Sequence, residues 1–170
     1  MKYPGLLGEL EADRGFAATI ADSRRSGVTA LDVTAVTSFF PLLSSAIAEG
    51  SGGTVLIVTS TYREAEQLTA EVGDLLGPDQ VEYYPAWETL PHERLSPRAD
   101  TVGRRLAVLR RLAGLDGDIP RVVIAPVRSV LQPQVRGLAD MVPVQIGVGD
   151  SYELSRLLND LVGAAYNRVD

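Results

Sequence analysis

The chain has 170 residues, of which 45% are hydrophobic and 22% are charged, and its net charge is −6 at pH 7. This composition predicts a folded globular protein and argues against tight non-specific binding to nucleic acid, which needs a basic surface. With no cysteine and a single histidine, disulfides, thiolate metal sites and histidine-rich metal sites are excluded, and we predict a cytoplasmic protein without a cofactor.

The first 27 residues predict a helical lead-in, because apolar residues recur there at helical spacing. These apolar positions are Leu6, Leu7, Leu10, Phe16 and Ile20. Residues 28–33 form an extended apolar segment. A short helix is expected over residues 39–48, where Pro41 is tolerated only in the first turn. A glycine-rich loop follows at residues 50–53.

Three strands are predicted at residues 54–58, 81–84 and 121–125, and a helix separates each strand from the next. The first of these helices opens with a capping box formed by Thr61 and Glu64, and it ends at Gly77. Its buried stripe is expected to contain Ala65, Leu68, Val72 and Leu75. The strand at residues 54–58 is a continuous apolar run, which predicts a strand covered on both faces.

The second helix is expected to begin with Ser96 as its N-cap and Pro97 at its first position, and to end at Gly114. Its apolar stripe is expected to contain Ala99, Val102, Leu106, Leu109 and Ala113. The alternation of strands and helices predicts an α/β fold with a parallel sheet and helices on both faces.

After Pro133 the pattern changes and predicts a second, smaller domain. Residues 141–146 are expected to form a strand that leaves the sheet, and residues 151–162 a helix. A new extended element begins at Tyr166 and stops without a turn, which is the pattern of a fragment. We therefore divide the chain into a helical lead-in (1–27), an α/β domain (28–140) and the truncated beginning of a second domain (141–170).

A nucleotide-hydrolysing P-loop is excluded, because it needs a lysine at the start of a helix and the only lysine is Lys2. The glycines of residues 50–53 precede a strand, so they cannot present the amides of a helix N-terminus to phosphate. We therefore predict that the chain is not an enzyme and that it binds partners. The alternative is a stand-alone nucleotide-dependent α/β enzyme with a degenerate phosphate loop.

One segment carries a family resemblance. Residues 85–97 read PAWETLPHERLSP, after a helix that contains TxxEAEQL and before segments that read RLAVLRRL and VVIAPVRSVLQ. This order resembles the signature in the N-terminal, UvrB-like region of the bacterial transcription-repair coupling factors, Mfd. The signature residues that form our candidate site are Pro85, Ala86, Trp87, Glu88, Thr89, Leu90, Pro91, Glu93, Ser96 and Pro97.

The resemblance implies a degenerate copy of the first helicase-like domain of the excision repair protein UvrB, interrupted by a small domain that binds UvrA. The P-loop of UvrB corresponds to residues 33–38 here, which contain neither glycine nor lysine. In the full-length family protein, the resemblance implies recruitment of UvrA and regulation of a separate ATP-driven DNA translocase, which displaces stalled RNA polymerase.

The same resemblance sets the expected partners. UvrA is expected to bind the small second domain, most of which would lie beyond residue 170. RNA polymerase and DNA are expected to bind only C-terminal parts that this chain lacks, and other domains of the same protein are further partners. A membrane is not an expected partner, because no window of about 18 apolar residues occurs.

Single side chains of the signature have structural interpretations. Trp87, between two prolines, is expected to plug the core and to fix the loop against the sheet. Glu88 and Glu93 resemble a carboxylate pair for acid–base work, but we expect them to cap helices or to bond to the loop. His92 is expected to be a surface or hydrogen-bonded loop residue, since a lone histidine does not make a metal site.

Five arginines form one basic cluster in this acidic chain: Arg98, Arg104, Arg105, Arg110 and Arg111. A solvated helix face is the expected interpretation. The alternative is a partner surface, for which the candidates are Arg104, Arg105, Arg111 and, near the C-terminus, Tyr166, Asn167 and Arg168.

Overall fold

The computed structural model describes residues 5–89, 98–134 and 136–163. The chain divides into two compact units, Met1–Gln134 and Val135–Asp170. The second unit therefore begins earlier than the expected boundary after residue 140. The helical lead-in does not stand apart, because its helices pack within the first unit.

A three-stranded parallel sheet forms the centre of the first unit. Its strands are β1 (Val55–Thr59), β2 (Val81–Tyr83) and β3 (Val122–Pro126), in the order β1-β3-β2. Val122 of β3 is in register with Val55 on one side and with Val81 on the other. The prediction of three parallel strands is confirmed, and the last strand in the sequence lies in the middle of the sheet.

Six helices accompany the sheet. They are α1 (Leu6–Glu11), α2 (Arg14–Ser23), α3 (Phe40–Glu49), α4 (Tyr62–Leu76), α5 (Ala99–Leu112) and α6 (Val127–Leu131). Pro41 lies in the first turn of α3, where its missing N–H costs no helical hydrogen bond. Both halves of the capping box between Thr61 and Glu64 are present, and Gly77 ends α4 with a φ of 105°.

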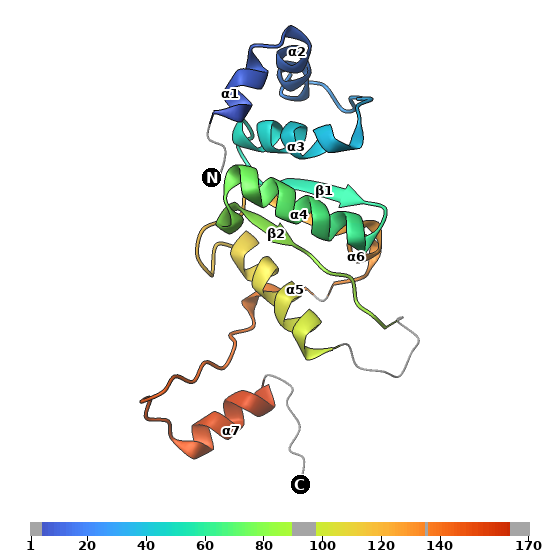
Figure 1. The fold of residues 1–170 in the computed structure, drawn as a ribbon. Coiled ribbons are helices and arrows are strands. Elements are labelled where there is room, and N and C mark those ends of the chain that lie inside the picture. The colour runs from blue at the N-terminus through green and yellow to red at the C-terminus, as the bar shows by residue number, and fades with distance from the viewer. Residues whose placement is uncertain (1–4, 90–97, 135, 164–170) are drawn as a thin grey trace. The chain divides into compact units, whose positions relative to one another are not determined.

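The larger core lies between one sheet face and helices α3 and α4. Ala65 and Val72 of α4 are fully buried against Val122 and Ile124 of β3, which confirms the predicted stripe of α4. Figure 1 shows α3 beside α4, with α1 and α2 on the far side of α3. Apolar burial on this face holds the helical lead-in and the sheet together.

The opposite face of the sheet is covered by α5, so helices lie on both sides as predicted. Val108 of α5 packs against Tyr84, Val123 and Ala125. On β1 the same face is open, with Leu56 54% exposed and Val58 48% exposed. The prediction that this strand is covered on both faces is therefore wrong. Its continuous apolar run belongs to an edge strand, and all five residues of the central strand β3 are buried.

Helix α5 packs through a different stripe from the predicted one. Its buried residues are Thr101, Arg105, Val108 and Arg110. From the predicted stripe, Leu109 is half-buried in this core, whereas Ala99, Val102 and Ala113 are exposed. The predicted stripe rested on apolar residue types alone. It was wrong because two arginines bury their side chains through specific polar and aromatic partners.

The extended apolar segment at residues 28–33 has no regular secondary structure, and its large apolar side chains, such as Val28 and Leu31, are exposed. One expected strand does not form. In the second unit, residues 141–146 lack a strand, because no described segment pairs with them. A strand needs a partner for its backbone hydrogen bonds, and apolar composition supplies none.

The second unit contains helix α7 (Leu154–Gly163), which begins three residues later than predicted and ends at the predicted glycine. A turn precedes it, in which the backbone N–H of Gly147 donates to Asp150 Oδ2 at 2.7 Å. The predicted extended element from Tyr166 lies outside the described residues. Across the described parts of both units, no helix has the length and apolar character needed to cross a membrane.

Candidate functional site

The carboxyl ends of the strands are the edge at which α/β proteins bind ligands. Here the turn from β1 into α4 places the carboxylate of Glu64 at the helix N-terminus. Ser60 Oγ donates to Glu64 Oε2 at 2.6 Å, the backbone N–H of Thr61 donates to the same oxygen at 3.2 Å, and Thr61 Oγ1 accepts from the backbone N–H of Glu64. This is the reciprocal capping box of Thr61 and Glu64, and it places a negative charge at the N-terminus of α4.

The hydrogen bond from Ser60 is the main cause of a lowered pKa of the Glu64 carboxyl. Burial opposes this shift, and the backbone N–H groups of Thr61 and Ser60 add to it. A carboxyl whose pKa is lower in the folded protein stabilises the fold above its unfolded pKa, and this stabilisation is lost as the pH falls through the folded pKa. We expect the Glu64→Gln variant to lose less of its free energy of unfolding than the wild type when the pH is lowered. Urea unfolding at neutral and at acidic pH measures it, with the exposed Glu66→Gln as the matched control on the same helix.

The signature segment is docked at the same edge of the sheet, and residues 85–89 of it are described. The backbone N–H of Trp87 donates to Gln132 Oε1 at 2.7 Å, and Gln132 Nε2 donates to the carbonyl oxygen of Trp87 at 3.1 Å. Arg128 Nη2 donates to the carbonyl oxygen of Glu88 at 3.4 Å. Two side chains at α6 therefore hold the extended backbone of the signature.

Glu88 links the signature to the start of α5. Its carboxylate accepts a hydrogen bond from Thr101 Oγ1 and one from the backbone N–H of Arg98 at 3.4 Å. The bond from Thr101 is the main cause of the lowered pKa of the Glu88 carboxyl. Glu88 is therefore hydrogen-bonded to the first residues of α5, and this favours its structural interpretation. The helix has Arg98 as its N-cap residue, without a side-chain cap bond, so the predicted N-cap at Ser96 is wrong.

The remaining signature residues lie outside the described part of the chain. They are Leu90, Pro91, His92, Glu93, Arg94, Leu95, Ser96 and Pro97. The expectations for Glu93 and His92 therefore stay predictions. Pro85 is buried, and Ala86, Trp87 and Thr89 are half-buried.

Arg105 is the centre of the described signature contacts. Its guanidinium carbon lies 4.2 Å from the centroid of the Tyr84 ring and 4.3 Å from that of Trp87. Its Nη1 donates to the carbonyl oxygen of Pro85 at 2.5 Å, and the side chain is fully buried. Burial lowers the pKa of Arg105, an effect that Tyr84 opposes. Stacking a cation between two rings offsets part of the cost of its burial. Trp87 is half-buried and stacks on Arg105, which lies between it and Tyr84 at the end of β2.

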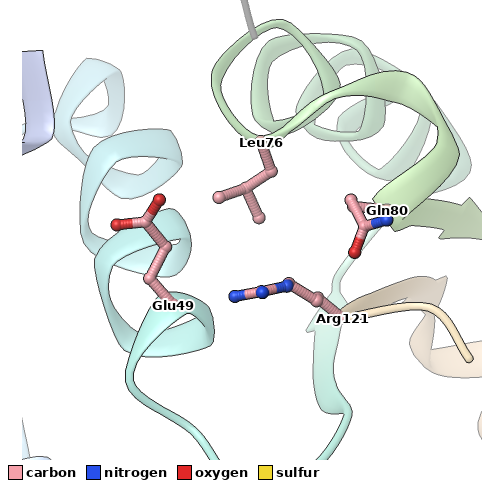
Figure 2. A pocket seen from close by; sticks show the side chains of 4 residues that line it. All are labelled: Glu49, Leu76, Gln80 and Arg121. Carbon is pink, nitrogen blue, oxygen red and sulfur yellow. The ribbon is translucent and has the colours of Figure 1, made fainter. Parts of the chain in front are cut away.

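A separate hollow of about 270 Å³ lies at the opposite edge of the sheet (Figure 2). Glu49 lines one side, and Gln80 and Arg121 line the other, with Leu76 between them. Gln80 and Arg121 precede β2 and β3, so the hollow lies at the amino ends of the strands. That edge lacks the helix N-termini that bind anions in this fold class. Among the described residues, no group of three potential metal-ligating side chains occurs.

Comparison with known proteins decides the family. No family model matches the chain. Over 133 residues, or 76% of the chain, it is 48% identical to the transcription-repair-coupling factors of Mycobacterium bovis and Mycobacterium tuberculosis. It is 28% identical over 131 residues to that of Bacillus subtilis. The chain is a homologue of the transcription-repair coupling factors. It matches the N-terminal region of these factors, and the match covers only 10% of the length of the mycobacterial relatives.

In this chain, most of the predicted basic cluster is internal. Arg110 forms an ion pair with Asp116, with Nε and Oδ2 2.6 Å apart. Arg111 pairs with Glu82, and its Nη2 donates to the carbonyl oxygen of Asp79 at 2.7 Å. Both arginines therefore tie the end of α5 to neighbouring segments.

The structure corrects two candidates for the partner surface. Arg105 is fully buried, and Arg111 is half-buried and ion-paired, so neither is a free surface cation. The solvated-face interpretation is likewise wrong for Arg105 and Arg110. Arg98 and Arg104 are exposed, and Arg104 stays a candidate. Tyr166, Asn167 and Arg168 lie outside the described residues.

Sequence reasoning did not single out Gln132 or Thr101, although both hold the signature segment. Gln132 is 45 residues from Trp87 in the sequence, and Thr101 is 13 residues from Glu88. No local pattern marks a side chain that bonds to so distant a backbone. The only available signal was the presence of Gln132 in the motif VVIAPVRSVLQ, which contributed to the family resemblance.

Proposed function

We propose that this chain is a non-catalytic interaction module of a transcription-repair coupling factor. In the longer protein it helps to recruit UvrA and regulates the ATP-driven DNA translocase that displaces stalled RNA polymerase. The 48% identity to the mycobacterial factors supports the assignment to this system. The chain spans about a tenth of the length of these relatives, so the motor activity belongs to other parts of the longer protein.

The observation that carries the non-catalytic part is the absence of glycine and lysine both from residues 33–38, the counterpart of the UvrB P-loop, and from the turn between β1 and α4. At the β1–α4 turn, the carboxylate of Glu64 accepts hydrogen bonds from Ser60 Oγ and from the backbone N–H of Thr61. A phosphate next to this carboxylate would meet a like charge. The glycine-rich segment at residues 50–53 precedes β1 and opens no helix. These features favour the interaction module over the alternative of a nucleotide-dependent enzyme.

Isothermal titration with Mg-ATP separates the two functions. We expect no heat of binding near neutral pH, because the only lysine is Lys2 and the carboxylate of Glu64 at the β1–α4 turn would repel a phosphate. Micromolar affinity for Mg-ATP would favour the alternative enzyme if the Glu64→Lys variant bound Mg-ATP with a different affinity. This variant replaces the carboxylate at the turn with a cation.

The part of the proposal that concerns UvrA rests on the second unit. Helix α7 carries a stripe of large apolar residues, and Leu154, Leu158 and Val162 are 69%, 50% and 69% exposed. An exposed apolar stripe of this kind is typical of a surface that other protein covers. In the family resemblance, this small domain is the one that binds UvrA.

A pull-down with purified UvrA tests this part. We expect the 170-residue chain to retain UvrA weakly or not at all. A version continued with the next several tens of residues from the Mycobacterium tuberculosis factor should retain it well, because a small domain of that size can bury the α7 stripe. Contributions of Tyr166, Asn167 and Arg168 are expected only in the longer version.

Two variants test which unit forms the contact with UvrA in the pull-down. In the longer version, Leu158→Glu on α7 should reduce retention of UvrA, whereas Arg104→Ala on α5 should leave it unchanged if the second unit forms the contact. Equal and tight retention by the short and long versions would place the UvrA site on the first unit and contradict this part of the proposal.

A further inference from the structure

Helix α6 is the last helix of the first unit, which ends at Gln134. Ser129 is its one buried residue, whereas Val127 and Val130 are each 42% exposed and Leu131 is 78% exposed. Neither of the two core clusters in the described part of the chain contains an α6 residue. Apolar packing therefore contributes little to holding α6 on the first unit.

A helix as short as α6 is not stable by itself, because few backbone hydrogen bonds offset the cost of forming the first turn. Ser129 Oγ donates to the carbonyl oxygen of Pro126, and the backbone N–H of Gln132 donates to that of Arg128 at 3.2 Å. Both bonds stay within residues 126–132. Contacts with a distant segment are therefore needed to hold this part of the chain in place.

The signature segment supplies these contacts. In the described part of the chain, Gln132 uses both ends of its side-chain amide on the backbone of Trp87, with Oε1 accepting at 2.7 Å and Nε2 donating at 3.1 Å. Two facing residues of an antiparallel sheet exchange the same pair of bonds. Arg128 adds a weaker bond, since its Nη2 lies 3.4 Å from the carbonyl oxygen of Glu88.

The signature backbone is itself fixed to the body of the first unit by α5. Arg105 donates to the carbonyl oxygen of Pro85, and Thr101 donates to the carboxylate of Glu88. Helix α5 thus holds the signature, and the signature holds Gln132. The chain passes from the first unit to the second after Gln134, two residues further on.

We propose that the Gln132–Trp87 pair is a joint that fixes the point at which the chain leaves the first unit. While the pair is closed, residues 127–134 belong to the first unit. When the signature backbone moves away from Gln132, α6 loses its main hold and residues 127–134 become a flexible tether between β3 and the second unit. An extended chain spans about 3.5 Å per residue, so this tether reaches up to roughly 28 Å. The signature segment thereby controls the reach of the second unit, whatever that unit binds.

Amide hydrogen exchange of the whole chain, followed by NMR, tests whether the pair holds α6. In Gln132→Ala, the protection of the backbone amide at position 132 should fall about tenfold or more, the factor expected for losing two ordinary hydrogen bonds. The amides of the buried strand β3 should keep their protection, because they exchange only by global unfolding. Gln134 is exposed, so Gln134→Ala is the matched control and should leave both unchanged.

Spin-label distances test the reach of the tether. The chain has no cysteine, so labels on Ala70→Cys in α4 and Asn159→Cys in α7, both exposed positions, are unique. The distance distribution should extend to longer values when Gln132→Ala is added, and it should stay unchanged with Gln134→Ala. Gln132→Glu can accept from the N–H of Trp87 but cannot donate to its carbonyl oxygen, so it should give a smaller effect in both experiments.

Lower protection at position 132 together with longer distances, both in Gln132→Ala and neither in Gln134→Ala, supports the proposal. The proposal is wrong if the amide at position 132 is unprotected in the wild type, or if the distances do not change in Gln132→Ala. An equal loss of protection in β3 would also contradict it, because the variant would then have lost stability as a whole. None of these outcomes depends on binding to UvrA.

Discussion

Replacing Ile124 with alanine should lower the free energy of unfolding by about 3–4 kcal/mol, as expected for removing a fully buried branched side chain. Ile124 is fully buried in the central strand β3 and belongs to the core that α3 and α4 complete. Close packing on both sides prevents the surroundings from collapsing into the cavity. Urea unfolding followed by circular dichroism measures this change in the free energy of unfolding, and the slope m against urea concentration should stay constant.

The matched control is Leu56→Ala on β1, which is also an apolar truncation in the same sheet. Leu56 is 54% exposed, so the loss should be about 1 kcal/mol or less. The contrast between the two variants tests the strand order β1-β3-β2 directly. Similar losses at both positions would contradict the placement of β1 at an uncovered edge.

Replacing Trp87 with alanine should cost about 3 kcal/mol, near the lower end of the range for large aromatic truncations, because Trp87 is half-buried. The variant removes the indole ring and one of the two stacking partners of Arg105, which then stays buried with less compensation. Urea unfolding measures the loss, and Trp87→Phe should recover part of it because a ring remains.

Tyr62→Ala is the control for this prediction, since Tyr62 is a 61% exposed aromatic residue on α4. Its loss should be within about 0.5 kcal/mol, as for most surface substitutions. A different result would change the interpretation of the signature. If Trp87→Ala left stability unchanged but abolished binding to UvrA, Trp87 would be an exposed binding residue and its structural assignment would be wrong.

Several elements could be predicted from the sequence because their causes are local. The capping box of Thr61 and Glu64 and the stop at Gly77 fixed both ends of α4, and both depend on residues within one helical turn. The three strands were likewise visible as apolar runs between turn signals. The exclusion of a P-loop followed from the absence of any lysine after Lys2.

The candidate site was predicted only in part. The motif at residues 85–97 identified the family, and the structural roles of Trp87 and Glu88 followed from its prolines and helix start. The prediction that Arg105 belongs to a solvated helix face was wrong. A charged residue on a helix is usually solvated, and Arg105 is buried here because two rings at the end of a distant strand stack on it. Local charge patterns cannot reveal such a partner.

By itself, the sequence determined the type and limits of most elements, since helix caps, turns and apolar periodicity act over a few residues. Only the tertiary structure decided the order of the strands, the exposed edge at β1, the buried face of α5 and the failure of residues 141–146 to form a strand. These features depend on which segments meet in space. A strand forms only where a partner accepts its backbone hydrogen bonds, and an arginine is buried only where rings and carbonyl oxygens surround it.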